Sequence, residues 1–180
     1  MIHKTLKDCS EKLTPFRKEV LGKIIQSPVV GFDETGINLN GKSVWLHTAS
    51  TQNYTLLNLH EKRGIAAMES FGLLSQYEGI AVHDRWASYF HFDQCGHALC
   101  NAHLLRELKY LHEDLGYKWA KALIKLIHKS KEKAEKINPL SMYMLRSIEK
   151  KFSETVAWGL RQCSKEGTHI SRIGTRGRPK

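Results

Sequence analysis

Two aspartates, Asp33 and Asp84, each end a short apolar run that is typical of a buried strand. The run PVVGF precedes Asp33, and GIAVH precedes Asp84. Hard Mg²⁺ prefers carboxylate oxygens, so two such side chains on neighbouring strand ends could form a divalent-metal site for phosphodiester chemistry. The same positions also suit an aspartate that only forms a turn or caps a helix. The chemistry usually requires a third acidic ligand, and the sequence offers no obvious one.

Composition restricts the class of protein that could carry such a site. With 180 residues, 41% hydrophobic and 26% charged, the chain can bury a core, so we expect one main domain with appendages. It contains no apolar run long enough to span a bilayer and no apolar signal core near its start, which predicts a cytoplasmic protein. Its four cysteines are widely scattered, as is typical of reduced thiols: Cys9, Cys95, Cys100 and Cys163.

The positive charge is concentrated in the second half of the chain. The net charge is +10, and residues 117–151 contain ten Lys or Arg against three Glu. Residues 161–180 contain six Lys or Arg against one Glu. Such a distribution favours a polyanionic partner, because lysines and arginines that neutralise phosphates release condensed counterions. A solvated, solubilising helix face is the other interpretation.

The elements that must position the aspartates follow from periodicity and turn signals. Helical spacing predicts a leading helix over residues 15–26, and the apolar run before Asp33 predicts the first strand. The dipeptide Asn40-Gly41 predicts a tight hairpin to a second strand, and residues 54–59 supply a third. A helix over about 64–76 and the strand that ends at Asp84 come next.

A leucine stripe predicts another helix after a short fifth strand in HALC: Leu104, Leu105, Leu108, Leu111 and Leu115. Two basic helices are then expected, at about 118–136 and 139–163, and a flexible tail from residue 164. The expected fold is α/β, a ribonuclease H-like mixed sheet of three antiparallel strands, a helix and parallel strands, with a basic helical insertion. In that layout the strands before Asp33 and Asp84 are adjacent and parallel, so the two carboxylates converge at one sheet edge.

Several motifs in order resemble the DDE transposases of the insertion-sequence-66 family. They are GFDETG, the hairpin NGKSVWLHTAS, EKRG, YEGIAVHDRWASY and CNAHLLRELKYL. The resemblance covers about residues 15–180 and implies metal-dependent DNA strand cleavage and transfer with Mg²⁺ or Mn²⁺. It places the first two catalytic, metal-binding carboxylates at Asp33 and Asp84, and implies transposon ends and target DNA as partners in the bacterial nucleoid.

The third catalytic carboxylate departs from this resemblance. In the family it is a Glu in an Asn-Asn-x-x-Glu-Arg segment, and this sequence contains no such segment. We therefore expect a C-terminally truncated catalytic domain that is inactive alone. Glu107 could substitute, because many ribonuclease H-like enzymes carry their last acidic ligand on the corresponding helix; the alternative is an ordinary exposed acid.

A histidine and cysteine cluster follows the second aspartate. Cys95, His97, Cys100 and His103 have the spacing C-x-H-x-x-C-x-x-H. Cys100 and His103 also resemble a C-x-x-H element of several DDE transposase groups that supports the active-site structure. Strand alternation at residues 97–100 would place these side chains on opposite faces, so structural packing is favoured over a support role or a zinc site.

Two basic features are candidate DNA contacts. Lys118, Lys121, Lys125 and Lys129 recur at three- and four-residue intervals and form one ridge that could follow a phosphate backbone. In the tail, RGRPK with Arg176 and Arg178 resembles a minor-groove hook, and an ordinary basic linker is the alternative.

These observations predict four segments: a leading helical segment at 1–27, an incomplete catalytic core at 28–116, a basic helical insertion at 117–163 and a basic tail at 164–180. The leading hypothesis is a DDE transposase catalytic-domain fragment. One alternative is a non-catalytic DNA-binding remnant or regulator that acts with intact transposase subunits. The other is a ribonuclease H-like nuclease that uses Glu107.

Overall fold

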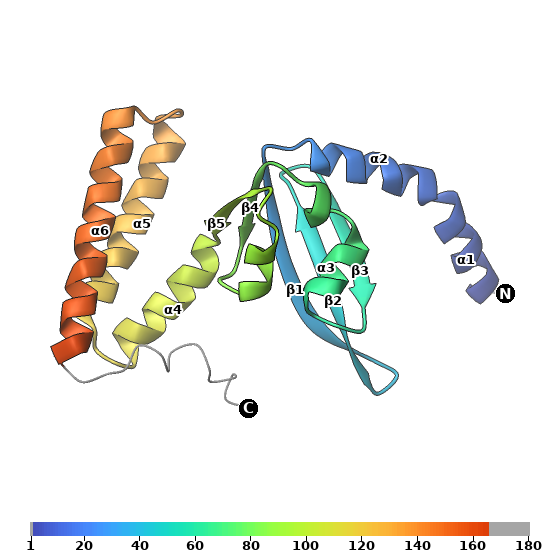
Figure 1. Ribbon diagram of the computed structural model, residues 1–180, viewed down its shortest axis with the longest axis horizontal. Helices are drawn as coiled ribbons and strands as arrows, with labels where there is room; N and C mark the ends of the chain where they lie inside the picture. The colour runs from blue at the N-terminus through green and yellow to red at the C-terminus, as the bar shows by residue number, and fades with distance from the viewer. Residues whose placement is uncertain (1, 166–180) are drawn as a thin grey trace. The chain divides into compact units, whose positions relative to one another are not determined.

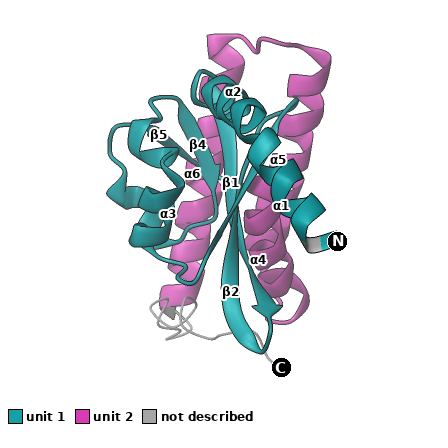
Figure 2. Cartoon of the chain, turned by 90° about the vertical axis from the view of Figure 1, so that its right-hand side faces the viewer, with its two compact units in different colours: residues 1–100 teal, residues 101–180 magenta. Residues whose placement is uncertain are grey.

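The computed structural model describes residues 2–165 and divides the chain into two compact units, residues 1–100 and 101–180 (Figure 2). The first unit contains the sheet, and the second contains three helices. The predicted division into a core and an insertion at residue 117 stays a prediction. Within residues 2–165, no helix is both long and apolar enough to cross a lipid bilayer.

Five strands in the order β3-β2-β1-β4-β5 form the sheet of the first unit (Figure 1). β1 pairs antiparallel with β2, which pairs antiparallel with β3, whereas β4 is parallel to both β1 and β5. This is the mixed, ribonuclease H-like sheet that the sequence predicted, and the prediction is confirmed. The strands are β1 (Val29–Leu39), β2 (Lys42–Ser50), β3 (Thr55–His60), β4 (Ile80–His83) and β5 (Gly96–Leu99).

The β1–β2 hairpin turns at the two residues that the sequence indicated. Asn40 has a φ of 51° and Gly41 a φ of 80°. Two consecutive positive φ angles match the right-handed twist of the flanking strands, and Asn-Gly adopts them at low cost. The Asn38 side chain also accepts a hydrogen bond from the Gly41 N–H at 2.9 Å. This turn sets the register that pairs Gly31 with Ser50 at the far end of the hairpin.

One face of the sheet packs against helices in the hydrophobic core of the first unit. α2 (Thr14–Ile25) contributes Val20 and Ile24, and β1 contributes Val30 and Phe32. The rest of this core comes from α3 (Ile65–Phe71), the short 3-10 helices η1 (Leu74–Gln76) and η2 (Ala87–His91), and the segments around them. Because side chains alternate along β1, Asp33 is exposed while Phe32 and Glu34 are buried.

Two helices differ from the sequence prediction. The helix expected over 64–76 ends at Phe71, because Gly72 adopts a left-handed conformation with a φ of 70°, and a separate turn, η1, follows. The leading helical segment predicted at 1–27 consists of two helices, since α1 (Ile2–Lys12) precedes α2, and no residue of α1 whose burial is described is buried.

The second unit consists of α4 (Asn101–Glu113), α5 (Lys118–Lys136) and α6 (Met142–Lys165). Its core includes Leu108 and Leu111 from α4, Ala120 and Leu123 from α5, and Cys163 from α6. α5 has the predicted bounds, and α6 begins three residues after the predicted start at Pro139. The tail from residue 166, with Arg176 and Arg178, lies outside the described residues.

Candidate metal and catalytic site

Asp33 lies on β1, and Asp84 directly follows the last residue of the adjacent parallel strand β4. The β1–β4 pairing ends with Gly31 opposite Val82, and each aspartate follows its paired residue by two positions. Side chains alternate along β1, so Asp33 lies on the face opposite to the buried Phe32 and Glu34. The convergence of the two carboxylates, which the order of the elements indicated, stays a prediction.

Each aspartate is held by one backbone N–H group. The Glu34 N–H donates to Asp33 Oδ1 at 3.0 Å, and the Trp86 N–H donates to Asp84 Oδ1 at 2.9 Å. The Asp33 residue is exposed, and the Asp84 side chain is 26% exposed. Oxygen atoms therefore remain accessible on both side chains, and this donor set suits a hard cation such as Mg²⁺ or Mn²⁺.

A third ligand does not join the pair within the part of the chain that the structure describes. No group of three or more His, Cys, Asp or Glu side chains in residues 2–165 is arranged to hold a metal ion. Glu107 is exposed and lies on α4, in the second unit. Its role as a ligand stays a prediction.

A buried ion pair lies directly beside Asp84. The Glu34 side chain is only 1% exposed, and its Oε1 accepts hydrogen bonds from Arg63 Nε at 2.8 Å and Nη2 at 2.5 Å. The Tyr89 hydroxyl donates to the other oxygen, Oε2. Burial raises the pKa of Tyr89, and the negative charge of Glu34 raises it further, so this phenol remains a donor. Both oxygens of the buried carboxylate are thus satisfied.

Arg63 also lies close to Asp84 and to two tryptophans. Its Nη2 is 3.8 Å from Asp84 Oδ2, and its guanidinium carbon is 4.1 Å from the ring centroid of Trp86 and 5.0 Å from that of Trp45. Such cation–π contacts stabilise a guanidinium group in a defined place. Arg63 therefore connects the β3–α3 loop to the segment that carries the second aspartate.

On the buried side of β4, two histidines continue the polar network. His83 is fully buried, its Nε2 is 2.9 Å from His97 Nδ1, and its Nδ1 contacts the backbone carbonyl oxygen of Asp84. Its ring stacks on that of Tyr89, with centroids 4.3 Å apart. Burial lowers the pKa of His83, which favours the neutral imidazole.

The C-x-H-x-x-C-x-x-H cluster does not form a metal site in residues 2–165. His97 is engaged with His83, and its Nε2 lies 3.0 Å from the Phe92 carbonyl oxygen. Cys95 is buried, with its thiol directed at the same carbonyl at 3.3 Å. Cys100 is half-buried, and its N–H donates to the His83 carbonyl oxygen at 2.7 Å. These contacts fit a role in packing beside Asp84 and do not support zinc binding.

The predicted basic ridge lies on the exposed side of α5. Lys118, Lys121, Lys125 and Lys129 are all exposed, whereas Leu123 on the same helix is buried. The spacing therefore produces the one-sided distribution that the sequence predicted. Whether the ridge contacts DNA stays a prediction.

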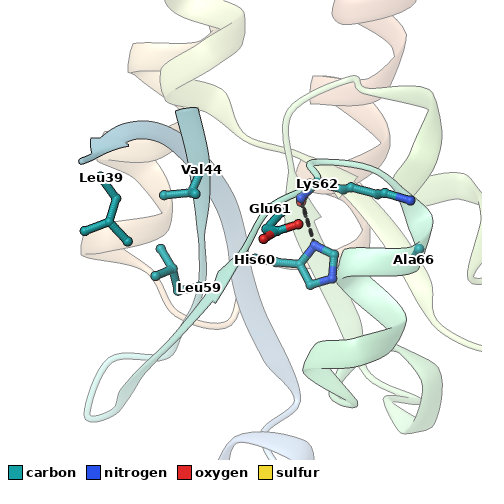
Figure 3. Close-up of a pocket in the computed structure, with 7 residues that line it drawn as sticks. All are labelled: Leu39, Val44, Leu59, His60, Glu61, Lys62 and Ala66. Carbon is teal, nitrogen blue, oxygen red and sulfur yellow. Dashed lines mark hydrogen bonds between the residues drawn. The ribbon is translucent and has the colours of Figure 1, made fainter. Parts of the chain in front are cut away.

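A pocket of about 530 Å³ lies away from the aspartates, where the β1–β2 hairpin, the end of β3 and the start of α3 meet (Figure 3). The Lys62 N–H donates to His60 Nδ1 at 2.9 Å at its edge. Neither Asp33 nor Asp84 lines it, and it is not part of the candidate metal site. The lining residues are Leu39, Val44, Leu59, His60, Glu61, Lys62 and Ala66.

Three residues of this network were not among the predicted site residues: Glu34, Arg63 and Tyr89. The sequence does contain one indication for Glu34. It follows Val30 and Phe32 at a spacing of two residues, so along a strand its side chain belongs to the same buried face. A buried carboxylate requires a donor partner. The identity of that partner depended on the path of the β3–α3 loop, which local sequence does not determine.

Two solved structures are similar to this chain at low sequence identity and low TM-score. One is the HTLV-2 integrase catalytic core domain in complex with magnesium, with 12% identity over 69% of this chain and 81% of that chain, and a TM-score of 0.33. The other is the simian T-cell lymphotropic virus intasome in complex with PP2A regulatory subunit B56 gamma, with 11% identity over 71% of this chain and 46% of that chain, and a TM-score of 0.34. No curated protein matches the sequence.

The family comparison covers almost the whole chain. The family described as "Transposase IS66 family" matches residues 1–174, a range that includes both aspartates, the five strands and all of the described helices. The motifs around Asp33 and Asp84 indicated the same family. The chain belongs to the IS66 family of DDE transposases.

Proposed function

We propose that Asp33 and Asp84 hold the divalent metal with which this transposase domain cleaves and joins DNA strands. The observation that carries the proposal is that each aspartate stands two residues beyond the Gly31–Val82 pair, Asp33 on β1 and Asp84 just after the parallel strand β4. An exposed and a partly exposed carboxylate in that arrangement are suited to Mg²⁺ or Mn²⁺.

The chain's own groups prepare the two ligands. The Trp86 N–H fixes one oxygen of Asp84, the Glu34 N–H fixes one oxygen of Asp33, and each carboxylate keeps a second oxygen. When bound, the metal would supply Lewis-acid stabilisation of the attacking and leaving oxygens at the scissile phosphate. Restricting the carboxylates beforehand reduces the entropy that metal binding must overcome.

Two carboxylates alone are expected to bind metal weakly and to support little strand transfer. The printed sequence has no Asn-Asn-x-x-Glu-Arg segment, and Glu107 is the remaining candidate for a third ligand. If Glu107 is a ligand, Glu107→Gln should weaken Mg²⁺ binding as much as Asp84→Asn does. An unchanged affinity would remove Glu107 from the site.

Calorimetric titration with Mg²⁺ and Mn²⁺ tests the main proposal. Asp33→Asn and Asp84→Asn should each abolish measurable binding, because each removes a charged ligand and leaves the shape of the side chain intact. Asp93→Asn is the matched control, since Asp93 is an exposed aspartate of the same unit. Equal binding by all three variants would contradict the assignment.

A non-catalytic DNA-binding role is the second candidate, and the exposed lysine ridge of α5 favours it. A metal-dependent nicking assay on supercoiled DNA separates the two. Cleavage that Asp33→Asn abolishes supports a catalytic domain, whereas DNA binding without cleavage supports the remnant or regulator. Cleavage that also requires Glu107 would support a ribonuclease H-like nuclease.

A further inference from the structure

Arg63 is placed so that two carboxylates compete for the same nitrogen atom. Its Nη2 lies 2.5 Å from Glu34 Oε1 and 3.8 Å from Asp84 Oδ2. The first distance is that of a charge-assisted hydrogen bond, and the second is too long for one. Arg63 therefore pairs with Glu34 and stands beside Asp84 without binding it.

The competition is decided by burial and by shape. Glu34 is almost fully buried and accepts two N–H groups from Arg63, so releasing it would leave a buried charge without its cation. Asp84 is more exposed and already has the Trp86 N–H as a donor. The rings of Trp45 and Trp86 add cation–π contacts that help to hold the guanidinium group in this position.

This balance affects metal binding, because a guanidinium hydrogen-bonded to Asp84 would occupy the oxygen that a cation needs. Arg63 and Glu34 together carry no net charge, so the pair adds little to the electrostatic potential at Asp84. Without Glu34, its nearest described anion would be Asp84. We infer that Glu34 is a positioning residue for the metal site: it restrains Arg63 and so keeps the Asp84 carboxylate available to the metal. This inference rests on the proposed function.

A double-mutant cycle in the full chain tests it, with Mn²⁺ as the probe and calorimetric affinity as the readout. Glu34→Gln should weaken binding by about two- to fivefold, within the range expected when a partly exposed ion pair forms with the ligand. Adding Arg63→Gln should return the affinity to within about twofold of wild type, because the competing charge is gone. Glu69→Gln removes an exposed carboxylate of the same unit and should leave the affinity unchanged.

The readout distinguishes positioning from simple structural support. If Glu34 and Arg63 only stabilised the fold, the double variant would bind no better than Glu34→Gln, and that result would overturn the inference. Wild-type affinity in Glu34→Gln would also overturn it. Should Glu34→Gln fail to fold, the double variant still decides, since near-wild-type affinity is expected there and a large loss contradicts the role.

Failure of the proposed function gives a different pattern. If Asp84→Asn bound Mn²⁺ as wild type does, the metal site itself would be wrong and both proposals would fall. If Asp84→Asn abolished binding while the Glu34 and Arg63 variants had no effect, only the restraint on Arg63 would be rejected. Far-ultraviolet circular dichroism at the titration temperature establishes that each variant is folded.

Discussion

Gly159 on α6 packs directly against the indole ring of Trp119 on α5. A Cβ atom built on Gly159 would lie 2.6 Å from Cδ2 of Trp119, closer than carbon atoms approach in folded proteins. Glycine at this buried position therefore lets the two helices come together around the tryptophan. The contact belongs to the core of the second unit, in which Trp119 packs with Leu123 and Cys163.

Gly159→Ala should lower the free energy of unfolding by about 1–3 kcal/mol, the usual cost of overpacking a well-filled core. Gly22→Ala is the matched control, because Gly22 also lies in a helix but has no atom within 4 Å of its built Cβ. Gly22→Ala should raise the free energy of unfolding by about 0.4–1 kcal/mol, because alanine reduces the conformational entropy of the unfolded chain. Urea unfolding of both variants makes the comparison. A Gly159→Ala protein as stable as wild type would contradict the packing.

Because the Tyr77 phenol is buried, we expect the free energy of unfolding to fall at high pH. The residue is fully buried, and its hydroxyl donates to the Ser27 carbonyl oxygen at 2.9 Å. Burial raises the pKa of this phenol above its ordinary value of 10.0. Above pH 10 the unfolded chain therefore loses a proton that the folded chain keeps, and the free energy of unfolding falls as the pH rises.

Tyr77→Phe should reduce that slope by up to about 1.4 kcal/mol per pH unit, the contribution of one proton. At pH 8 the free energy of unfolding of Tyr77→Phe should be about 0.5–1.5 kcal/mol lower than that of wild type, because the hydrogen bond is missing. Tyr143→Phe, at a side chain that is 82% exposed, should change neither quantity. Chemical unfolding at several pH values between 8 and 11 measures the slopes. A slope unchanged in Tyr77→Phe would contradict the assignment.

The elements that the sequence predicted correctly are those whose conformation depends on residues close to one another in the chain. Asn40-Gly41 adopts its turn through its own φ preferences. The apolar runs before Asp33 and Asp84 become strands that bury one face, with Val30 and Phe32 on β1 and Ala81 and His83 on β4. The end of α3 at Gly72 was missed because an isolated glycine at that point is compatible with either a continuing helix or a C-terminal cap. The leading segment was predicted as helical, but the separate bounds of α1 were not, and its apolar residues Ile2 and Leu6 are exposed.

The candidate site shows the same distinction between local and long-range information. Asp33 and Asp84 could be assigned to neighbouring strand ends because the order of the elements predicts that β1 and β4 are parallel neighbours. The contact of Arg63 with Glu34 joins residues 29 positions apart through a loop whose path depends on the whole sheet. Such long-range polar contacts are specified by tertiary packing, so neither spacing nor composition reveals them.

Thiol reactivity provides a separate test of the cysteine interpretation. Cys9 is exposed, Cys100 is half-buried, and Cys95 and Cys163 are buried. Burial raises the pKa of the Cys95 thiol, which lowers its thiolate fraction at neutral pH. A chromogenic disulfide reagent should therefore label Cys9 first.

Cys9→Ser should remove the fast phase of labelling and leave the slower phases intact. Because residues 2–165 contain no zinc-binding group, added zinc should not protect Cys95 or Cys100 from the reagent. Metal analysis of the purified protein should find no stoichiometric zinc. Protection of both thiols by an equimolar amount of zinc would restore the zinc interpretation.

The lysine ridge of α5 predicts a defined salt dependence of DNA binding. If Lys118, Lys121, Lys125 and Lys129 all contact phosphates, replacing the four with Gln should flatten the slope of log affinity against log salt by about 3–4. The loss should be the same for unrelated DNA sequences, since phosphate contacts do not read bases. The matched control replaces four exposed lysines of α1 and α2 with Gln, namely Lys4, Lys7, Lys12 and Lys18. Both variants change the net charge equally, so a slope that flattens only in the α5 variant locates the contacts on that helix, whereas equal flattening would mean that net charge alone attracts the DNA.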